Sequence, residues 1–191
     1  VLLFSLVLHE VSHGLTALSL GDETAKNEGR LSLNPLVHLD PFGSVLVPLL
    51  LYIVTAGRGP LFGWAKPVPV NPNNFRDRKW GVLKVALAGP SANFAVAIFF
   101  GLLLRFSVLP VNLWPFLQTI VIYNLLWGFF NLVPIPPLDG SQILFSLLPA
   151  RFLEWQILLE RHGMILLMFF IFWGFKFLNV FVFLAYNFIV G

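Results

Sequence analysis

Apolar residues fall into long blocks along this chain, and polar segments separate the blocks. A helix needs about 20 predominantly apolar residues to cross the hydrocarbon core of a bilayer. Four blocks approach or exceed that length, at residues 1–20, 81–104, 113–133 and 163–190. The pattern predicts an all-α polytopic membrane protein with three transmembrane helices in its core. The last block is expected to form one span or two shorter pieces.

The segments between these blocks are shorter or more polar. Residues 42–56 are apolar but short and contain Pro48, which predicts a re-entrant or interfacial element. Residues 57–79 are rich in Pro, Gly and basic side chains and predict a loop. From Lys26 to Leu33 polar and apolar residues partly alternate, so we expect a small β-hairpin there.

The composition supports a membrane protein and limits the other classes. Of the 191 residues 58% are hydrophobic and 11% are charged, whereas about a quarter of the residues in a soluble domain are charged. The absence of cysteine excludes disulfides and thiolate metal ligands. The net charge is +3 and the basic residues form no stripe, so we expect no nucleic-acid partner. One domain is expected over 1–191, with a motif-bearing core at 1–145 and a C-terminal helical region at 146–191.

The basic residues predict how the chain is oriented. The polar segments 21–40 and 57–84 together hold eight Lys and Arg residues, whereas the turn between the two central spans offers only Arg105. The positive-inside rule places the two polar segments in the cytoplasm. We therefore expect a multi-pass membrane protein with a site that opens toward the cytoplasm.

The first apolar block contains the pattern His-Glu-Val-Ser-His, from His9 to His13. Residues four apart on a helix share a face, about 5–6 Å apart, so two imidazoles can bind one zinc ion. Glu10 stands beside them, placed to take a proton from zinc-activated water and to pass it to the leaving amine. Ionisable groups are costly to insert into a membrane and indicate a functional site. The alternative is a hydrated helix end where these residues pair with loop groups.

A catalytic zinc ion has three protein ligands and one open position, so a third ligand is needed. Asp139 is the best candidate, because it lies in the segment 131–140, whose prolines exclude a regular helix. Irregular backbone at membrane depth is tolerated where it lines a cavity. The helix carrying His13 and the span 113–133 end on the same predicted side, which allows the ligands to meet. The alternative for Asp139 is an ordinary Asp-Gly turn at the membrane surface.

Five stretches together resemble the site-2 protease family of intramembrane zinc metalloproteases, in particular short prokaryotic members without PDZ or CBS domains. The stretches are HEVSHG (9–14), GRLSLNPLVHLDPFGS (29–44), FGWAKPVPVNPNNF (62–75), ALAGPSANF (86–94) and NLVPIPPLDG (131–140). The resemblance implies a site-2 protease-like core that binds one Zn²⁺ per chain through His9, His13 and Asp139, with Glu10 as the catalytic base.

The resemblance also assigns roles to two asparagines. It implies that Asn131 positions substrate or stabilises the tetrahedral intermediate, which a hydrogen-bond donor near the metal can do. It implies that the segment from Gly89 to Asn93 packs the second core helix close to the active site, where Asn93 would contact substrate. The alternative for Asn93 is a plain interhelical hydrogen bond. The polar segment at 26–33 would pair with an unwound substrate by strand addition.

The implied partners are the lipid bilayer and a transmembrane protein substrate. A rival hypothesis is a membrane metal-binding or metal-transport protein that uses the same ligands, and another is an inactive relative acting as a chaperone. An intact base at Glu10 and ligand candidates at one membrane face favour the protease. His38 and Asp40 have no place in that mechanism and could cap the re-entrant element, contact lipid headgroups or form another metal site.

Overall fold

The computed structural model of the protein describes residues 1–58, 63 and 65–191, and every regular element in these residues is helical. The α-helices are α1 (Leu2–Ser19), α2 (Thr24–Asn27), α3 (Val47–Val54), α4 (Arg78–Arg105), α5 (Trp114–Asn131), α6 (Asp139–Leu147), α7 (Leu153–Phe169) and α8 (Phe175–Val190). The 3₁₀ turns are η1 (Pro35–His38), η3 (Pro72–Asn74), η4 (Val111–Leu113) and η5 (Ala150–Phe152), and the π-helical turns are η2 (Pro41–Leu46) and η6 (Phe170–Gly174).

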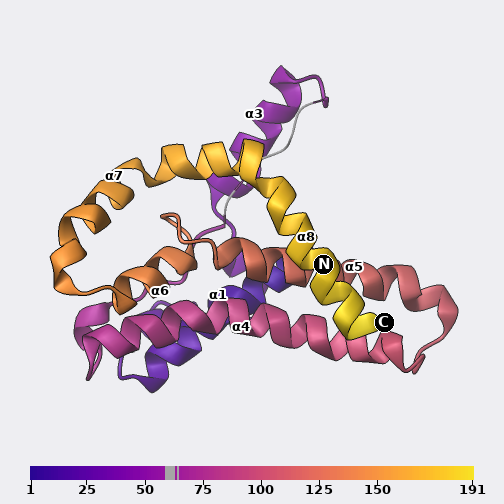
Figure 1. Ribbon diagram of the computed structural model, residues 1–191, viewed down its shortest axis with the longest axis horizontal. Coiled ribbons are helices and arrows are strands. Elements are labelled where there is room, and N and C mark those ends of the chain that lie inside the picture. The colour runs from indigo at the N-terminus through magenta and orange to yellow at the C-terminus, as the bar shows by residue number, and fades with distance from the viewer. Residues whose placement is uncertain (59–62, 64) are drawn as a thin grey trace.

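Four helical segments are long and apolar enough to cross a membrane, namely Leu2–Ser19, Arg78–Arg105, Val111–Asn131 and Leu153–Val190. The first three coincide with the predicted core spans, and the fourth contains the predicted C-terminal block 163–190 but begins ten residues before it. α4 runs along the length of the molecule and α5 returns beside it (Figure 1). α1 and α6 pack on the half of α4 that holds the site, and α8 packs on α5 and α4. The all-α prediction is therefore confirmed.

The largest apolar core lies where α4, α5 and α8 meet. Its fully buried side chains are small or branched, which lets the three helices approach closely. They are Ala97, Leu104, Leu117, Val121, Leu125 and Val182. Much of the remaining apolar surface faces outward, for example at Phe172, Trp173 and Phe177, which are each more than half exposed. Exposed apolar surface of this extent suits contact with lipid.

The β-hairpin predicted at 26–33 is wrong, and the described residues contain no strand. The segment begins within α2 instead, because the side chain of Asp22 accepts hydrogen bonds from the backbone N–H and the hydroxyl of Thr24. The chain then turns back at Gly29, whose φ of +65° suits glycine, and the Arg30 N–H donates to Ala25 O at 2.8 Å. A short alternating pattern without a partner strand cannot compete with these local bonds, so the segment offers no edge for strand addition.

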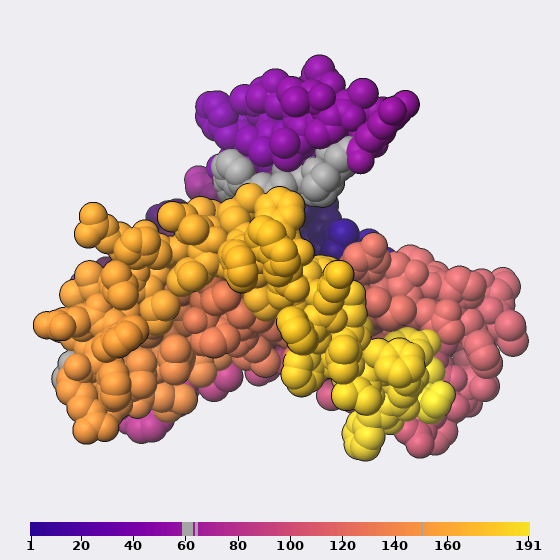
Figure 2. Space-filling model, turned by 45° about the horizontal axis from the view of Figure 1, so that its top comes forward, coloured from indigo at the N-terminus to yellow at the C-terminus, as the bar shows by residue number. Residues whose placement is uncertain are grey.

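The apolar segment Pro41–Val54 is too short to cross a membrane, as the sequence predicts. It consists of η2 and α3 and projects away from the other helices (Figures 1 and 2). The carboxylate of Asp40 accepts a hydrogen bond from Gly43 N at 2.6 Å and caps the start of this segment. His38 is fully buried, with Nε2 2.8 Å from Ser32 O. Both residues thus make structural contacts here.

Candidate metal centre

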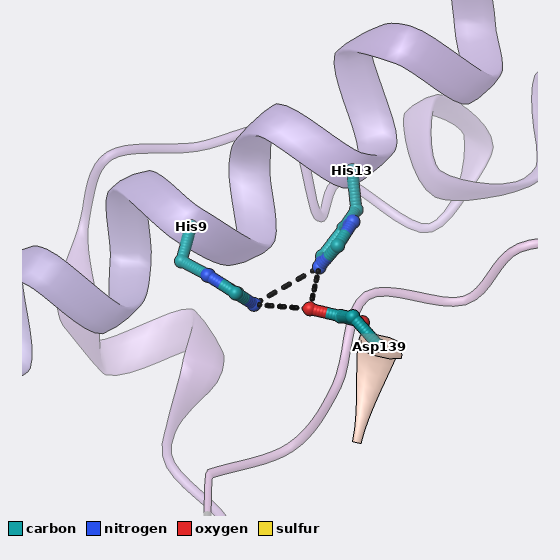
Figure 3. Close-up of side chains that lie close together, drawn as sticks. All are labelled: His9, His13 and Asp139. Carbon is teal, nitrogen blue, oxygen red and sulfur yellow. Dashed lines mark hydrogen bonds and ion pairs between the residues drawn. The ribbon is translucent and has the colours of Figure 1, made fainter. Parts of the chain in front are cut away.

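Two histidines from α1 and one aspartate from α6 converge on a single point (Figure 3). The Nε2 atoms of His9 and His13 lie 3.0 Å apart, because residues four apart share one face of a helix. The Oδ2 atom of Asp139 lies 3.0 Å from His9 Nε2 and 3.3 Å from His13 Nε2. In the described part of the chain, no other group of three such residues could hold a metal ion.

The proline-rich turn after α5 delivers Asp139 to the histidines. Asp139 is the first residue of α6, where the helix dipole favours a carboxylate. The turn folds back tightly, since a Cβ on Gly140 would lie 2.2 Å from Leu132 O. Behind the turn, α7 packs against Pro136, because a Cβ on Gly163 would lie 2.6 Å from that ring.

Hydrogen bonds on the far side of each imidazole determine which nitrogen carries the proton. His13 Nδ1 lies 2.7 Å from Val85 O, and a carbonyl oxygen can only accept, so Nδ1 is the protonated atom. His9 Nδ1 lies 2.7 Å from Asn93 Oδ1, again an acceptor. Each Nε2 atom therefore presents a lone pair to the centre, as metal ligation requires.

These donors fit a zinc ion. Two lone pairs and the buried Asp139 Oδ2, which accepts no hydrogen bond, face one another and repel unless a cation lies between them. In a tetrahedral zinc site with bonds of about 2.0–2.1 Å, neighbouring ligand atoms are separated by about 3.3 Å. The observed separations of 3.0–3.3 Å are close to that value.

Glu10 lies beside the metal ligands and is held by the main chain. Its Oε2 accepts a hydrogen bond from Val68 N at 2.9 Å, whereas Oε1 has no partner among the described residues. Val68 belongs to an extended segment whose ends are fixed on either side. Lys66 N donates to His38 O at 2.9 Å, and Asn71 N donates to Asp22 Oδ2 at 2.7 Å.

A cavity of about 410 Å³ opens beside the metal ligands and Glu10. Its walls are mainly apolar, with Asn131 and Gln142 as further polar groups near Asp139. The apolar lining residues are Pro67, Val68, Val70, Pro72, Phe75, Val82, Val85, Ala86 and Pro137. Gln142 is absent from our sequence prediction, although its place three residues after Asp139 on the same helix could have indicated it.

The two asparagines occupy different places. Asn131 lines the cavity and donates from Nδ2 to Trp127 O at 3.0 Å. Asn93 is fully buried behind the His9 ring and does not line the cavity. Its Nδ2 bonds to Ser5 O and to Asn124 Oδ1, which corresponds to the interhelical alternative.

The close approach expected near Gly89 is present. A Cβ on this residue would lie 2.5 Å from His13 Nε2 and 2.6 Å from His9 Nε2. Only glycine therefore allows α4 to pass directly beside the ligand atoms.

Comparisons with known proteins identify the family. The model of peptidase family M50 matches residues 107–170. Relatives that carry the name "Putative zinc metalloprotease" include YwhC and Rip2. YwhC of Bacillus subtilis (strain 168) is 38% identical over 173 residues, which are 86% of this chain and 74% of that protein. This chain belongs to peptidase family M50.

A second relative with this name supports the assignment to family M50. Rip2 of Mycolicibacterium smegmatis is 34% identical over 140 residues, 72% of this chain and 52% of that protein. The protein named zinc metalloprotease MJ0392, from Methanocaldococcus jannaschii, is 35% identical over 74 residues, 39% of this chain and 22% of that protein. No solved structure matches. The resemblance to site-2 proteases is thus confirmed, and the chain is a membrane zinc metalloprotease of family M50.

Proposed function

We propose that this M50 peptidase hydrolyses peptide bonds within or next to the transmembrane segments of other membrane proteins. The observation that carries this proposal is the convergence of His9, His13 and Asp139 beside Glu10, from helices α1 and α6, on one open cavity. His9 and His13 lie ten and six residues before the end of α1 at Ser19. At about 1.5 Å per residue, they lie roughly 9–15 Å from that end, at a depth inside the hydrocarbon layer.

The three ligands would hold one zinc ion per chain. When bound, zinc supplies a Lewis acid that polarises a carbonyl group and lowers the pKa of water. Glu10 acts as the base, because its free Oε1 is available to take a proton while the Val68 N–H holds Oε2. The same carboxyl group then delivers the proton to the leaving amine.

Two further parts of the cavity act on the substrate. The amide of Asn131 has a second N–H beyond the one bonded to Trp127 O, and it would donate to the substrate carbonyl oxygen, where negative charge develops. The apolar walls would accept the apolar side chains of a membrane segment and exclude bulk water. The substrate must be unwound there, because a helical peptide bond is shielded by its own hydrogen bonds.

We propose residues 1–191 as one domain, with a motif-bearing core at 1–145 and a helical region at 146–191. The cytoplasmic assignment of 21–40 and 57–84 would place the site's opening on the cytoplasmic side. A metal transporter would need ligands along a path through the bilayer. In the described chain, the three-residue metal cluster is confined to one place.

The test uses purified protein in liposomes with a panel of tagged single-span membrane proteins. Mass spectrometry of the products locates each cut. We expect cuts within or beside the transmembrane segment. Removal of zinc with a chelator should abolish cleavage, and addition of zinc should restore it. Zinc uptake into the liposomes without any cleavage would instead support a transporter and contradict the proposal.

A further inference from the structure

Two asparagines are buried in the apolar interior behind the metal centre, outside the cavity. Asn93 of α4 and Asn124 of α5 are 0% and 1% exposed. A buried amide is unfavourable unless its hydrogen-bonding groups are satisfied. The hydrogen-bonding groups of these amides are paired with each other, with backbone carbonyls and with the proposed metal ligand His9. They form a chain of hydrogen bonds that ends at His9.

Each bond in the chain has a fixed direction. Asn124 Nδ2 donates to Ile120 O at 2.8 Å, which leaves Asn124 Oδ1 to accept from Asn93 Nδ2 at 3.0 Å. Asn93 Nδ2 also donates to Ser5 O at 3.2 Å. Its Oδ1 therefore faces His9 Nδ1 at 2.7 Å and can only accept a hydrogen bond from it.

The direction of this chain determines the chemistry of His9. If the Asn93 amide were flipped, its NH₂ group would face His9 Nδ1, and the imidazole proton would have to move to Nε2. That nitrogen could then no longer bind a metal. In the flipped state Asn93 Oδ1 would face two acceptor oxygen atoms, on Ser5 and Asn124, so Asn124 is one of the two groups that disfavour it.

His13 has no comparable side-chain support, because its Nδ1 is held by the main-chain carbonyl of Val85. His9 is thus the ligand whose orientation depends on side chains, and those side chains come from two other membrane helices. Outer hydrogen bonds of this kind orient metal-binding histidines and raise metal affinity.

We infer that Asn124 is a positioning residue for the metal centre, which holds Asn93 so that His9 presents Nε2 to the metal. This inference rests on the proposed zinc site. It assigns to a residue in the middle of α5, without contact to metal or substrate, a measurable effect on zinc affinity.

The test is zinc affinity in detergent, measured by competition with a chromogenic chelator. We expect Asn124→Leu to weaken zinc binding about 10-fold, and Asn93→Leu to weaken it by about 10- to 100-fold. In the Asn93→Leu background, adding Asn124→Leu should cause no further loss, because Asn124 acts through Asn93. Thr119→Val is the matched control, since Thr119 lies on the same helix, is only half-buried and bonds through its side chain only to Pro115 O.

A conservative variant separates positioning from packing. A buried Asp at position 124 would be neutral, so its hydroxyl can donate to Ile120 O and its carbonyl can accept from Asn93. Asn124→Asp should therefore retain wild-type zinc affinity within about threefold, against the 10-fold loss expected for Leu. If Asn124→Leu does not fold, Asn124→Ser takes its place in the same comparison, because its side chain is too short to bridge both partners.

Three outcomes would overturn the inference. Unchanged zinc affinity in Asn124→Leu beside a tightly binding wild type contradicts the positioning role of Asn124 alone, as does an equal loss with and without Asn93. A wild type that binds zinc no better than His9→Ala contradicts the proposed metal site itself, and the positioning role of Asn124 with it.

Discussion

Glycine at position 89 lets α4 lie close to the proposed metal ligands His9 and His13. A methyl group there would lie within 2.6 Å of the Nε2 atoms of both histidines. Small residues at helix contacts are common in membrane proteins. Here the contact partners are the two histidines of the proposed metal centre, so glycine would be needed for metal binding as well as for packing.

We therefore expect Gly89→Ala to lose most of its zinc and its peptidase activity while its helix content stays unchanged. Metal analysis and circular dichroism of the purified variant measure both. Ser91→Ala is the control, because Ser91 is exposed on the same helix and its substitution leaves the site untouched. Full zinc occupancy in Gly89→Ala would show that α4 does not lie where the structure places it.

The backbone of Val68 holds one oxygen of Glu10, and proline at that position removes the donor. A hydrogen bond to a charged group contributes about 1.5–3 kcal/mol. Val68→Pro should therefore lower kcat by about 10- to 100-fold, with zinc content unchanged, in a cleavage assay. Val70→Pro makes the same change at a residue whose N–H has no hydrogen-bond partner among the described residues. Equal activity of the two variants would contradict a role for the Val68 N–H.

At the scale of elements, Asp22 joins the end of α1 to the segment that leads into α4. The carboxylate accepts bonds from Thr24, Asn71 and Asn74, and it is fully buried. Burial alone would raise the pKa of Asp22, but the bonds from Thr24, Asn71 and Asn74 outweigh burial and hold this pKa below its usual value. The ionised form thus stabilises the arrangement that holds Val68 near Glu10.

The lowered pKa gives a pH dependence with a definite sign. A folded-state pKa below the unfolded value of about 3.9 contributes stability above that pH, and this contribution is lost as the pH falls through the folded pKa. Thermal unfolding of the wild type in detergent should lose this contribution below about pH 4. The Asp22→Asn variant should unfold at a lower temperature than the wild type at pH 7, and the two unfolding temperatures should converge in acid. Glu28→Gln, at an exposed position, should follow the wild type at every pH. A constant difference between Asp22→Asn and wild type would contradict the assignment.

The helices also show which features of the fold a sequence pattern alone can predict. Long apolar blocks predict the four spans, because length and hydropathy alone decide whether a helix can cross lipid. The hairpin at 26–33 fails, because a few alternating residues are a weak signal and the bonds of Asp22 and Arg30 decide the local fold.

Some parts of the site can likewise be predicted from the sequence, and others cannot. The spacing of His9 and His13 is local and readable, and Asp139 follows from the need for a third ligand. The Val68 N–H and the Asn124 amide carry no sequence signal, because a backbone donor is present in nearly every residue and a lone Asn in an apolar span has many roles. Their contacts join residues 58 and 31 positions apart, respectively, and need the fold to be seen.

On the scale of the whole molecule, a polar metal centre lies among helices with apolar outer surfaces. α3, α7 and α8 expose large apolar side chains, including Ile53, Phe169 and Phe188. The site is reached through an open cavity beside the extended segment around Val68. We propose that this arrangement hydrolyses peptide bonds, with Glu10 as the base.

The most direct measurement compares wild type and Glu10→Gln, purified in lipid, for zinc content and for cleavage of one tagged transmembrane substrate that the wild type cuts. Gln keeps the shape of Glu but cannot take a proton, so we predict about one zinc per chain in both proteins and cleavage reduced by at least 100-fold in the variant. Glu23→Gln, an exposed change near the end of α1, should cleave like the wild type. Cleavage by Glu10→Gln at a wild-type rate would contradict the mechanism.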